Sequence, residues 1–412
     1  MVAQASRLCS VLNRPEACST NQNFKHYQYP KPQAAAIAAT MCDFSFRGVF
    51  DLMECGIVGL PGAGKTTLFN CLTGAHASGF ATAGGPGGLK PNVGVAHIPD
   101  PRLPLIASFI PTKKIVHATI QFVDIPGVVP GSGATKINAF LSHVRQVDAL
   151  CHVVRCFDDG GGPQKIDPAG DIDKMDTEMA IGDLQVAEAA LDKAARTART
   201  GEADAKARVT ALEKVKSLLE QGKPIRSLTT WSDPERLILK NYGMITAKPV
   251  LFVANVAEDD LRGQSPAAQH VIKHAQANAG QAVVVCAKLE AELIELDEAD
   301  REEMLKSMGL AEPALGPLAR AANSLLGLAS FYTAGEKEVR AWPIAIGATA
   351  PQAAGSIHSD IERGFIRAEC FHIDDLVKYK TEKAIREAGK LRSEGKNYRL
   401  QDGDVVHFLF NV

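Results

Sequence analysis

A glycine-rich run between an apolar segment and a helical pattern constrains this chain more than any other feature. From Cys55 the sequence reads as a short apolar strand, Gly59–Thr66 fits the pattern G-x-x-x-x-G-K-T, and Leu68 and Leu72 fall on one helix face. In such a strand–loop–helix unit, the backbone N–H groups of the loop surround phosphate oxygens. We therefore expect an α/β nucleotide-binding domain whose phosphate site is this loop.

The spacing assigns roles to single residues of the loop. Gly59 and Gly64 let the backbone curve around the phosphates, while Lys65 is expected to reach the β and γ phosphates. Thr66 is expected to present its hydroxyl to Mg²⁺. The other loop residues that we expect at the nucleotide are Gly62, Ala63 and Thr67.

A second motif follows at the end of another apolar run, where Gln121–Gly127 finishes in D-x-x-G. Asp124 is expected to hold the metal, directly or through water, and the N–H of Gly127 to sense the γ-phosphate. Thr82 lies in a glycine-rich stretch between the two motifs and is the candidate switch threonine that closes on Mg²⁺. The alternative for Thr82 is an ordinary loop residue.

The segment where guanine-specific G proteins carry N-K-x-D differs here. This chain has Asn255 and Glu258, with Val256 in place of the lysine. Adenine offers an N6 donor and an N7 acceptor, which Asn255 can meet with both ends of its amide. Loss of the aspartate removes the main discrimination for guanine, so we expect ATP to be preferred. After a further strand at residues 282–285, Ala287 lies in the turn expected to pack under the base.

Charge, apolar content and cysteine content exclude several classes of protein. The 45 basic and 47 acidic residues give a net charge of −2, which excludes a generally basic nucleic-acid binder. No apolar run is long enough to span a bilayer, and nine scattered cysteines without a C-x-x-C pair argue against a disulfide framework or zinc site. Residues 193–216 and 376–399 are locally basic, which fits either contact with RNA phosphates or a solvated surface.

The chain divides into five segments. Residues 1–52 are a basic, acid-poor leader, which fits either a transit peptide or a disordered extension before a functional start at Met53. Apolar residues at spacings of three and four after residue 208 predict a helical hairpin. The other expected segments are the nucleotide-binding domain at 53–170 and 243–328, the hairpin at 171–242 and a C-terminal domain of short strands at 329–412.

Several long blocks give the chain a resemblance to a known family. From Met53 onward it resembles the YchF, or Obg-like, ATPase family, a TRAFAC-class group of P-loop proteins. The blocks that carry the resemblance are Pro91–Val95, His152–Phe157, Asn255–Glu258, Phe331–Trp342 and Ala348–Gly355. The resemblance implies a G-protein-like domain interrupted by an antiparallel helical hairpin and followed by a β-grasp domain of the TGS type.

The resemblance also implies an activity. Members of this family hydrolyse ATP in preference to GTP, bind ribosomes, and are linked to translation and stress responses. Val128 stands where G proteins usually carry the glutamine that orients water, which implies slow intrinsic hydrolysis. The family usually has an asparagine, a candidate potassium ligand, at the position of Gly62, so the glycine puts potassium stimulation in doubt. The switch segments at residues 80–91 and 131–138 also depart from the family pattern.

We therefore expect a ribosome-associated, cytoplasmic ATPase that binds ATP with Mg²⁺ and acts as a monomer, without a membrane or sequence-specific DNA as partner. The expected contact is the large ribosomal subunit or ribosomal RNA. If residues 1–52 are a transit peptide, the expected location is an organelle instead. The altered switch segments leave two alternatives open, a nucleotide-gated interaction module with little hydrolysis and a GTP-preferring GTPase.

Overall fold

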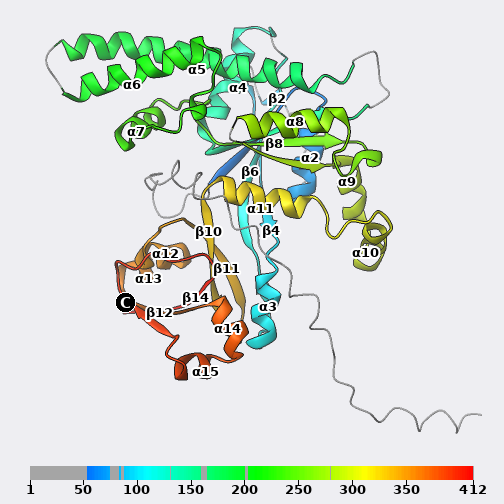
Figure 1. Cartoon of the computed structure of the whole chain (residues 1–412), viewed down its shortest axis with the longest axis vertical. Coiled ribbons are helices and arrows are strands. Elements are labelled where there is room, and N and C mark those ends of the chain that lie inside the picture. Colours follow the sequence, from blue (N-terminus) through cyan, green and yellow to red (C-terminus); the bar gives the residue numbers. More distant parts are fainter. Residues whose placement is uncertain are drawn as a thin grey trace, which may run out of the picture.

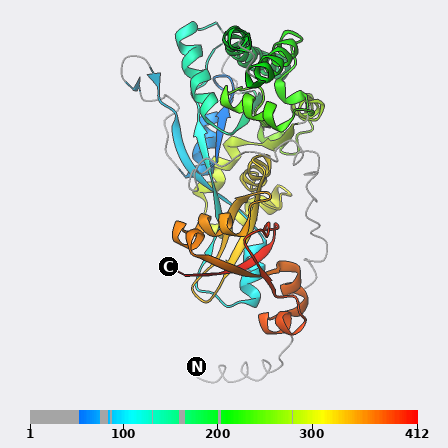
Figure 2. The same ribbon diagram turned by 90° about the vertical axis from the view of Figure 1, so that its left-hand side faces the viewer.

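The computed structural model describes most of the chain from Met53 onward. The described residues are 53–74, 83–84, 88–129, 131–158, 165–199, 203–278 and 280–411. The predicted leader, the candidate switch residue Thr82 and the segment between the two hairpin helices at 200–202 lie outside these ranges. Within them, the helical hairpin and the C-terminal domain lie at opposite ends of the molecule, with the nucleotide-binding sheet between them (Figure 1, Figure 2).

A six-stranded sheet forms the centre of the nucleotide-binding domain. Its strands run parallel except β4, which lies antiparallel to β6 at one edge. In spatial order the strands are β4 (Asn92–Ile98), β6 (Ala118–Asp124), β1 (Glu54–Val58), β7 (Ala149–Cys156), β8 (Val250–Val256) and β9 (Gln281–Val285). The loops after the parallel strands therefore meet beyond one end of the sheet, which is where ligands bind in open α/β sheets.

Helices bury both faces of this sheet, as the continuous apolar runs of its central strands predict. Alternate residues of β8 enter separate cores: Leu251 and Val253 face one, Phe252 and Ala254 the other. The first core includes side chains of α2 (Lys65–Thr73) and α11 (Leu315–Leu325), the second those of α4 (Ala134–Gln146), α5 (Pro168–Ala198) and α8 (Pro266–Ala277). The domain also contains β2 (Ala83–Gly84), β3 (Gly88–Leu89), α3 (Arg102–Phe109), the 3-10 helix η2 (Glu258–Asp260), α9 (Ala287–Glu295) and α10 (Glu298–Ser307).

Helix α5 and the following helix α6 form the hairpin (Figure 1). Leu212, Val215 and Leu219 of α6 are buried, so the helical spacing predicted from sequence is confirmed. They pack with small residues of α5, Ala187 and Ala190, which allow the two helices to approach closely. The elements that complete this part are α6 (Ala203–Glu220), the 3-10 helix η1 (Ile225–Ser227) and α7 (Asp233–Asn241).

The hairpin boundary expected at residue 171 falls inside α5, which begins at Pro168. The first turns of α5 belong to the nucleotide-binding core, where Met175 is buried against the sheet. Asp183 anchors the helix further along: its fully buried carboxylate accepts the backbone N–H groups of Ile245 (2.9 Å) and Thr246 (2.7 Å). The hairpin is therefore a continuation of a core helix and not a separately attached unit.

A second six-stranded sheet forms the C-terminal domain. In spatial order its strands are β13 (Arg392–Glu394), β12 (Phe365–His372), β14 (Asp404–Phe410), β10 (Leu328–Ala334), β11 (Val339–Ala345) and β5 (Ile115–Val116). The helices that accompany it are α12 (Ala350–Ile357), α13 (Ser359–Arg363), α14 (Ile373–Tyr379) and α15 (Glu382–Glu387). Strand β5 comes from the first half of the chain and pairs in parallel with β11. The sequence placed the start of this domain at residue 329 and did not predict that pairing.

A polar cluster, buried at Asp100 and Tyr332 and exposed at Asp402, joins the C-terminal domain to the nucleotide-binding domain. Asp100, just after β4, accepts hydrogen bonds from the side chain of Arg102 (2.9 Å) and from the hydroxyl of Tyr332 on β10. Arg102 also forms an ion pair with Asp402 (2.7 Å), whose other oxygen accepts the backbone N–H of Ser330 (2.8 Å). Burial raises the pKa of Tyr332 well above its ordinary value, so its hydroxyl remains protonated and can donate.

The predicted fold class is confirmed: a G-protein-like α/β domain with a helical hairpin and a C-terminal domain built on a mixed sheet. None of the helices in the described ranges is long and apolar enough to cross a membrane.

We predict that Tyr332→Phe lowers the free energy of unfolding by about 1 kcal/mol, because it removes one buried hydrogen bond without opening a cavity. Urea unfolding of the full chain measures the change. Tyr242→Phe is the matched control, since Tyr242 is only half-buried against the hairpin core. Equal stability of the two variants would show that the Tyr332 hydroxyl does not hold the domains together.

Candidate functional site

The P-loop follows β1 and turns into α2. Gly59 and Gly64 have φ angles of 147° and 89°, in the region that side chains disfavour. A Cβ atom on Gly59 would lie 2.4 Å from the carbonyl oxygen of Val153, and one on Gly64 would lie 2.2 Å from Nδ2 of Asn255. Only glycine fits at both positions, as the motif predicts, because residues of β7 and β8 approach the loop closely.

Lys65 is the first residue of α2 and its side chain is buried in the phosphate loop. Its Nζ donates a hydrogen bond to the carbonyl oxygen of Leu60 at 2.9 Å. The backbone of Gly127 lies close by, since a Cβ there would be 2.6 Å from the same Nζ. Burial lowers the pKa of Lys65 to about 8, while the nearby carboxylate of Asp124 opposes that shift.

The carboxylate of Asp124 lies beside the start of α2. Thr66 donates its hydroxyl to Oδ2 of Asp124 at 3.0 Å, and Nδ2 of Asn92 lies 3.5 Å from the same oxygen. The other oxygen, Oδ1, is buried without a hydrogen-bond partner. A carboxylate oxygen is costly to leave buried and unpaired, so the arrangement favours a bound cation. Hydroxyl and carboxylate oxygens are ligands that Mg²⁺ prefers, so Thr66 and Asp124 fit this ion.

Asn92 was not among the residues predicted for the site. It belongs to one of the sequence blocks that carry the family resemblance, and β4 places it directly opposite Asp124 in the antiparallel pair with β6. A polar residue at the start of a strand paired with a D-x-x-G strand is the signal that could have identified it.

The side-chain amide of Asn255 joins the P-loop to the start of α9. Its Nδ2 donates to the carbonyl oxygen of Ala63 at 2.9 Å, and its Oδ1 accepts the backbone N–H of Ala287 at 3.0 Å. The side chain is only 4% exposed. The two-ended contact with adenine inferred from sequence therefore differs from the structure, because the acceptor end of the amide is turned to Ala287.

The remaining base-site residues lie around this junction. Val256 is buried at the end of β8. Glu258 begins η2 and forms an ion pair with Lys288, with Nζ and Oε1 2.7 Å apart. Lys288 directly follows Ala287 in the first turn of α9. Two contacts therefore link this turn to the end of β8 and to η2: the buried hydrogen bond from Ala287 to Asn255 and the exposed ion pair of Lys288 with Glu258. Lys288 belongs to the turn that the sequence placed under the base, but its ion pair with Glu258 was not predicted.

The structure thus brings most of the predicted site residues together at one end of the sheet. Gly62 and Thr67 are exposed along the phosphate loop, and Ala63 is buried beneath it. Gly62 has no side-chain oxygen that could bind potassium. Thr82 lies outside the described residues, so its role as a switch threonine stays a prediction.

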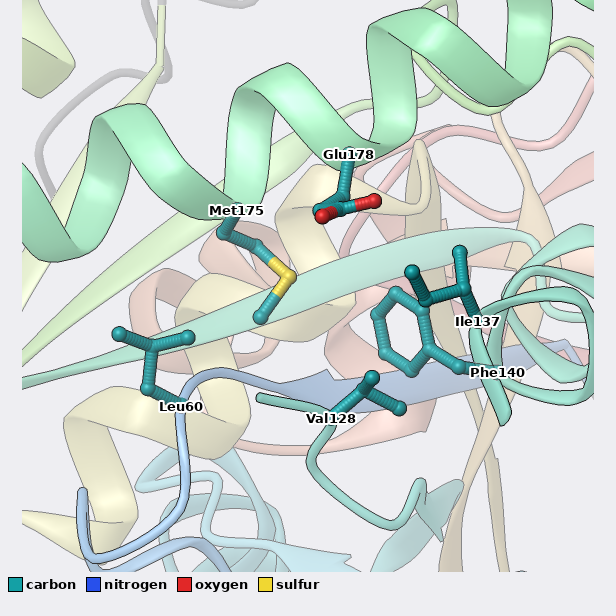
Figure 3. A pocket seen from close by; sticks show the side chains of 6 residues that line it. All are labelled: Leu60, Val128, Ile137, Phe140, Met175 and Glu178. Carbon is teal, nitrogen blue, oxygen red and sulfur yellow. The ribbon is translucent and has the colours of Figure 1, made fainter. Parts of the chain in front are cut away.

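A small apolar pocket lies beside the phosphate loop (Figure 3). Leu60 of the P-loop and Val128, directly after Gly127, line it together with Ile137 and Phe140 of α4 and Met175 of α5. Glu178 of α5 completes the lining. Val128, which stands in place of the water-orienting glutamine, therefore shares an apolar pocket with Met175 of the hairpin helix.

We predict that Lys65→Met abolishes nucleotide binding but makes the nucleotide-free protein more stable at pH 7. Below pH 8 the ammonium is charged in both states, and only the folded state bears the cost of its burial. Above the ordinary pKa of 10.5 the lysine is neutral in both states, so the cost disappears. Urea unfolding should give the variant an advantage of about 1–3 kcal/mol at pH 7 that fades as pH rises from 8 to 10.5. A pH-independent difference would contradict the buried charge.

We also predict that Val128→Thr lowers the free energy of unfolding by about 1 kcal/mol, because the new hydroxyl enters an apolar pocket. The matched control is Val129→Thr, since the neighbouring valine is 58% exposed and should tolerate the change. Urea unfolding of both variants provides the comparison. Equal effects would mean that Val128 does not occupy the pocket in solution.

Two family models match separate parts of the chain. Residues 54–187 match the family MMR_HSR1, described as 50S ribosome-binding GTPase. Residues 328–411 match YchF-GTPase_C, described as a protein of unknown function. The two matches cover the first part of the nucleotide-binding domain and the C-terminal sheet.

Curated proteins and a solved structure extend over nearly the whole described chain. The "Ribosome-binding ATPase YchF" of Haemophilus ducreyi is 44% identical over 366 residues, covering 87% of this chain and 99% of that protein. The protein of the same name from Bacillus subtilis is 42% identical, with 87% and 100% covered. The structure of the Schizosaccharomyces pombe YchF GTPase superposes with a TM-score of 0.76 at 32% identity, covering 87% of this chain and 98% of that one. The chain belongs to the YchF family.

Proposed function

We propose that this protein is a ribosome-binding ATPase that binds ATP with Mg²⁺ and hydrolyses it slowly to ADP and phosphate. The observation that carries the proposal is the grouping of Lys65, Thr66 and Asp124, with one carboxylate oxygen buried and unpaired. The names of the relatives support ribosome binding and the use of ATP, since they describe ribosome-binding ATPases. The cytoplasm, where ribosomes work, is the proposed location.

The residues act on the phosphates in distinct ways. The backbone of Gly59–Thr66 binds the phosphate oxygens, and Lys65 neutralises charge that develops on the γ-phosphate. Thr66 and Asp124 would hold Mg²⁺, which when bound would neutralise negative charge on the terminal phosphates. The N–H of Gly127 senses the γ-phosphate, while Thr82 is the proposed switch residue on the metal.

Slow turnover follows from Val128. Its apolar side chain packs in the pocket between the P-loop and α5, and a valine can neither accept nor donate the hydrogen bonds that orient an attacking water. We therefore propose that the ribosome completes the site and raises the rate, with regulation of translation or of the stress response as the biological outcome.

The hairpin and the C-terminal domain offer surfaces for ribosomal RNA. Exposed basic side chains gather near the free end of the hairpin, on both helices: Lys193, Arg196, Arg199 and Lys206. A second exposed set lies on α14, α15 and the chain that follows them in the C-terminal domain: Lys378, Lys380, Lys383, Arg386, Lys390, Lys396 and Arg399. Basic groups bind RNA phosphates by releasing counterions, so contact through these surfaces weakens steeply as salt rises.

We predict that ribosomes raise the ATP turnover of the wild-type protein and that Lys65→Ala removes both basal and stimulated turnover. The triple variant Lys193→Gln/Arg196→Gln/Arg199→Gln should keep basal turnover, because these residues lie far along the hairpin from the phosphate loop. It should lose most of the stimulation, and the slope of log affinity for ribosomes against log salt should fall by about 2. Phosphate release and co-sedimentation over a salt series measure both quantities.

Lys240→Gln/Lys273→Gln/Lys306→Gln is the matched control, because it removes three exposed positive charges on other helices. It should leave stimulation and salt slope unchanged. Absence of stimulation in the wild-type protein would contradict the proposed ribosome-coupled activity, while equal effects of the two triple variants would contradict the hairpin contact.

A further inference from the structure

The loops after β8 and β9 carry two charged groups at the rim of the base site. Nζ of Lys288 lies 2.7 Å from Oε1 of Glu258. Glu258 lies three residues after Asn255, whose amide binds the backbone N–H of Ala287, and Lys288 is the next residue after Ala287. The ion pair therefore lies at the entrance of the site where the two loops that flank the base meet.

This ion pair contributes little to the stability of the fold. Lys288 is 75% exposed and Glu258 is 44% exposed. Ion pairs of this kind contribute little to stability, because both charges are well solvated without the partner. The buried hydrogen bond from Ala287 to Asn255 already joins the same two loops. We therefore expect the pair to act on the bound nucleotide and not on the stability of the fold.

Guanine and adenine make opposite demands on a carboxylate at this position. Guanine presents N1–H and N2–H₂ donors on one edge, which need two acceptor oxygens side by side. Adenine presents an unprotonated N1 there, which a free carboxylate would repel. In the structure the ammonium of Lys288 binds one of the two Glu258 oxygens, so Glu258 does not present two free acceptor oxygens to guanine.

The backbone donor on the same side is also engaged. Guanine O6 needs a hydrogen-bond donor, and the N–H of Ala287 donates instead to Oδ1 of Asn255 at 3.0 Å. Both groups that would complement guanine, an acceptor pair and a backbone N–H, are thus satisfied within the protein.

We propose that Lys288 is a specificity-determining residue that acts through Glu258, holding its carboxylate in an ion pair and so selecting against guanine. This proposal rests on the proposed use of ATP and adds the residue that enforces it. Lys288 is a positioning residue in this scheme, because it acts on the base through the carboxylate.

The test measures dissociation constants for Mg²⁺ complexes of ATP, GTP and ITP by titration calorimetry on the full chain. Lys288→Met should free Glu258 and improve GTP binding relative to ATP by roughly threefold, because the effect is limited by the modest strength of an exposed ion pair. ITP lacks the N2 amino group, so its gain should be smaller. Lys288→Arg keeps the positive charge and should leave the ATP-to-GTP ratio close to that of the wild-type protein.

The double variant Lys288→Met/Glu258→Gln separates the proposed role from a general effect on the loop. Removal of the carboxylate charge should abolish the gain in GTP binding. An unchanged ratio in Lys288→Met, or the same gain in the double variant, would overturn the role of Lys288. Preference for GTP in the wild-type protein would instead contradict the proposed ATPase function, so the two failures are distinguishable. Thermal unfolding checks that each variant is folded.

Discussion

The buried amide of Asn255 is the contact on which the arrangement of the site depends. It links the phosphate loop, through the carbonyl of Ala63, to the loop after β9, through the N–H of Ala287. The phosphate loop approaches this amide so closely that position 64 must be glycine. Because one residue orders both loops, the phosphate site and the base site are preorganised together before a nucleotide binds.

The helical hairpin and the C-terminal domain both contact elements that line the nucleotide site. The hairpin helix α5 contributes Met175 to the pocket that Val128 also lines, and Val128 directly follows Gly127, the proposed γ-phosphate sensor. Strand β4 begins with Asn92 beside Asp124, and Asp100, two residues beyond its other end, binds Tyr332 of the C-terminal domain. The site is therefore connected by α5 to the hairpin and by β4 to the C-terminal domain.

The sequence predicted the parts of the site that depend on local strand–loop–helix patterns. Lys65 and Thr66 follow β1, and Asp124 ends the neighbouring parallel strand β6, so the three residues lie together. The apolar residues at spacings of three and four likewise predicted which face of α6 is buried. Contacts between distant segments could not be predicted in this way. The pairing of β5 with β11 joins residues more than two hundred positions apart, and neither short strand carries a signal for its partner.

The same reason explains the differences at the base site. The sequence predicted that the amide of Asn255 contacts the base, whereas in the structure both ends of the amide form hydrogen bonds with protein groups. The pairing of Glu258 with Lys288 likewise depends on how β8 and β9 lie side by side. Residue types thus identified the site, but the partners of each polar group required the three-dimensional arrangement.

The central claim is that this site binds ATP with Mg²⁺ in preference to GTP. Displacement of a fluorescent ATP analogue from the wild-type protein tests it most directly, with ATP and GTP as competitors and with Mg²⁺ present or chelated. We predict that ATP displaces the analogue at lower concentration than GTP and that chelation of Mg²⁺ weakens ATP binding. Displacement by GTP at equal or lower concentration, or ATP binding indifferent to Mg²⁺, would contradict it.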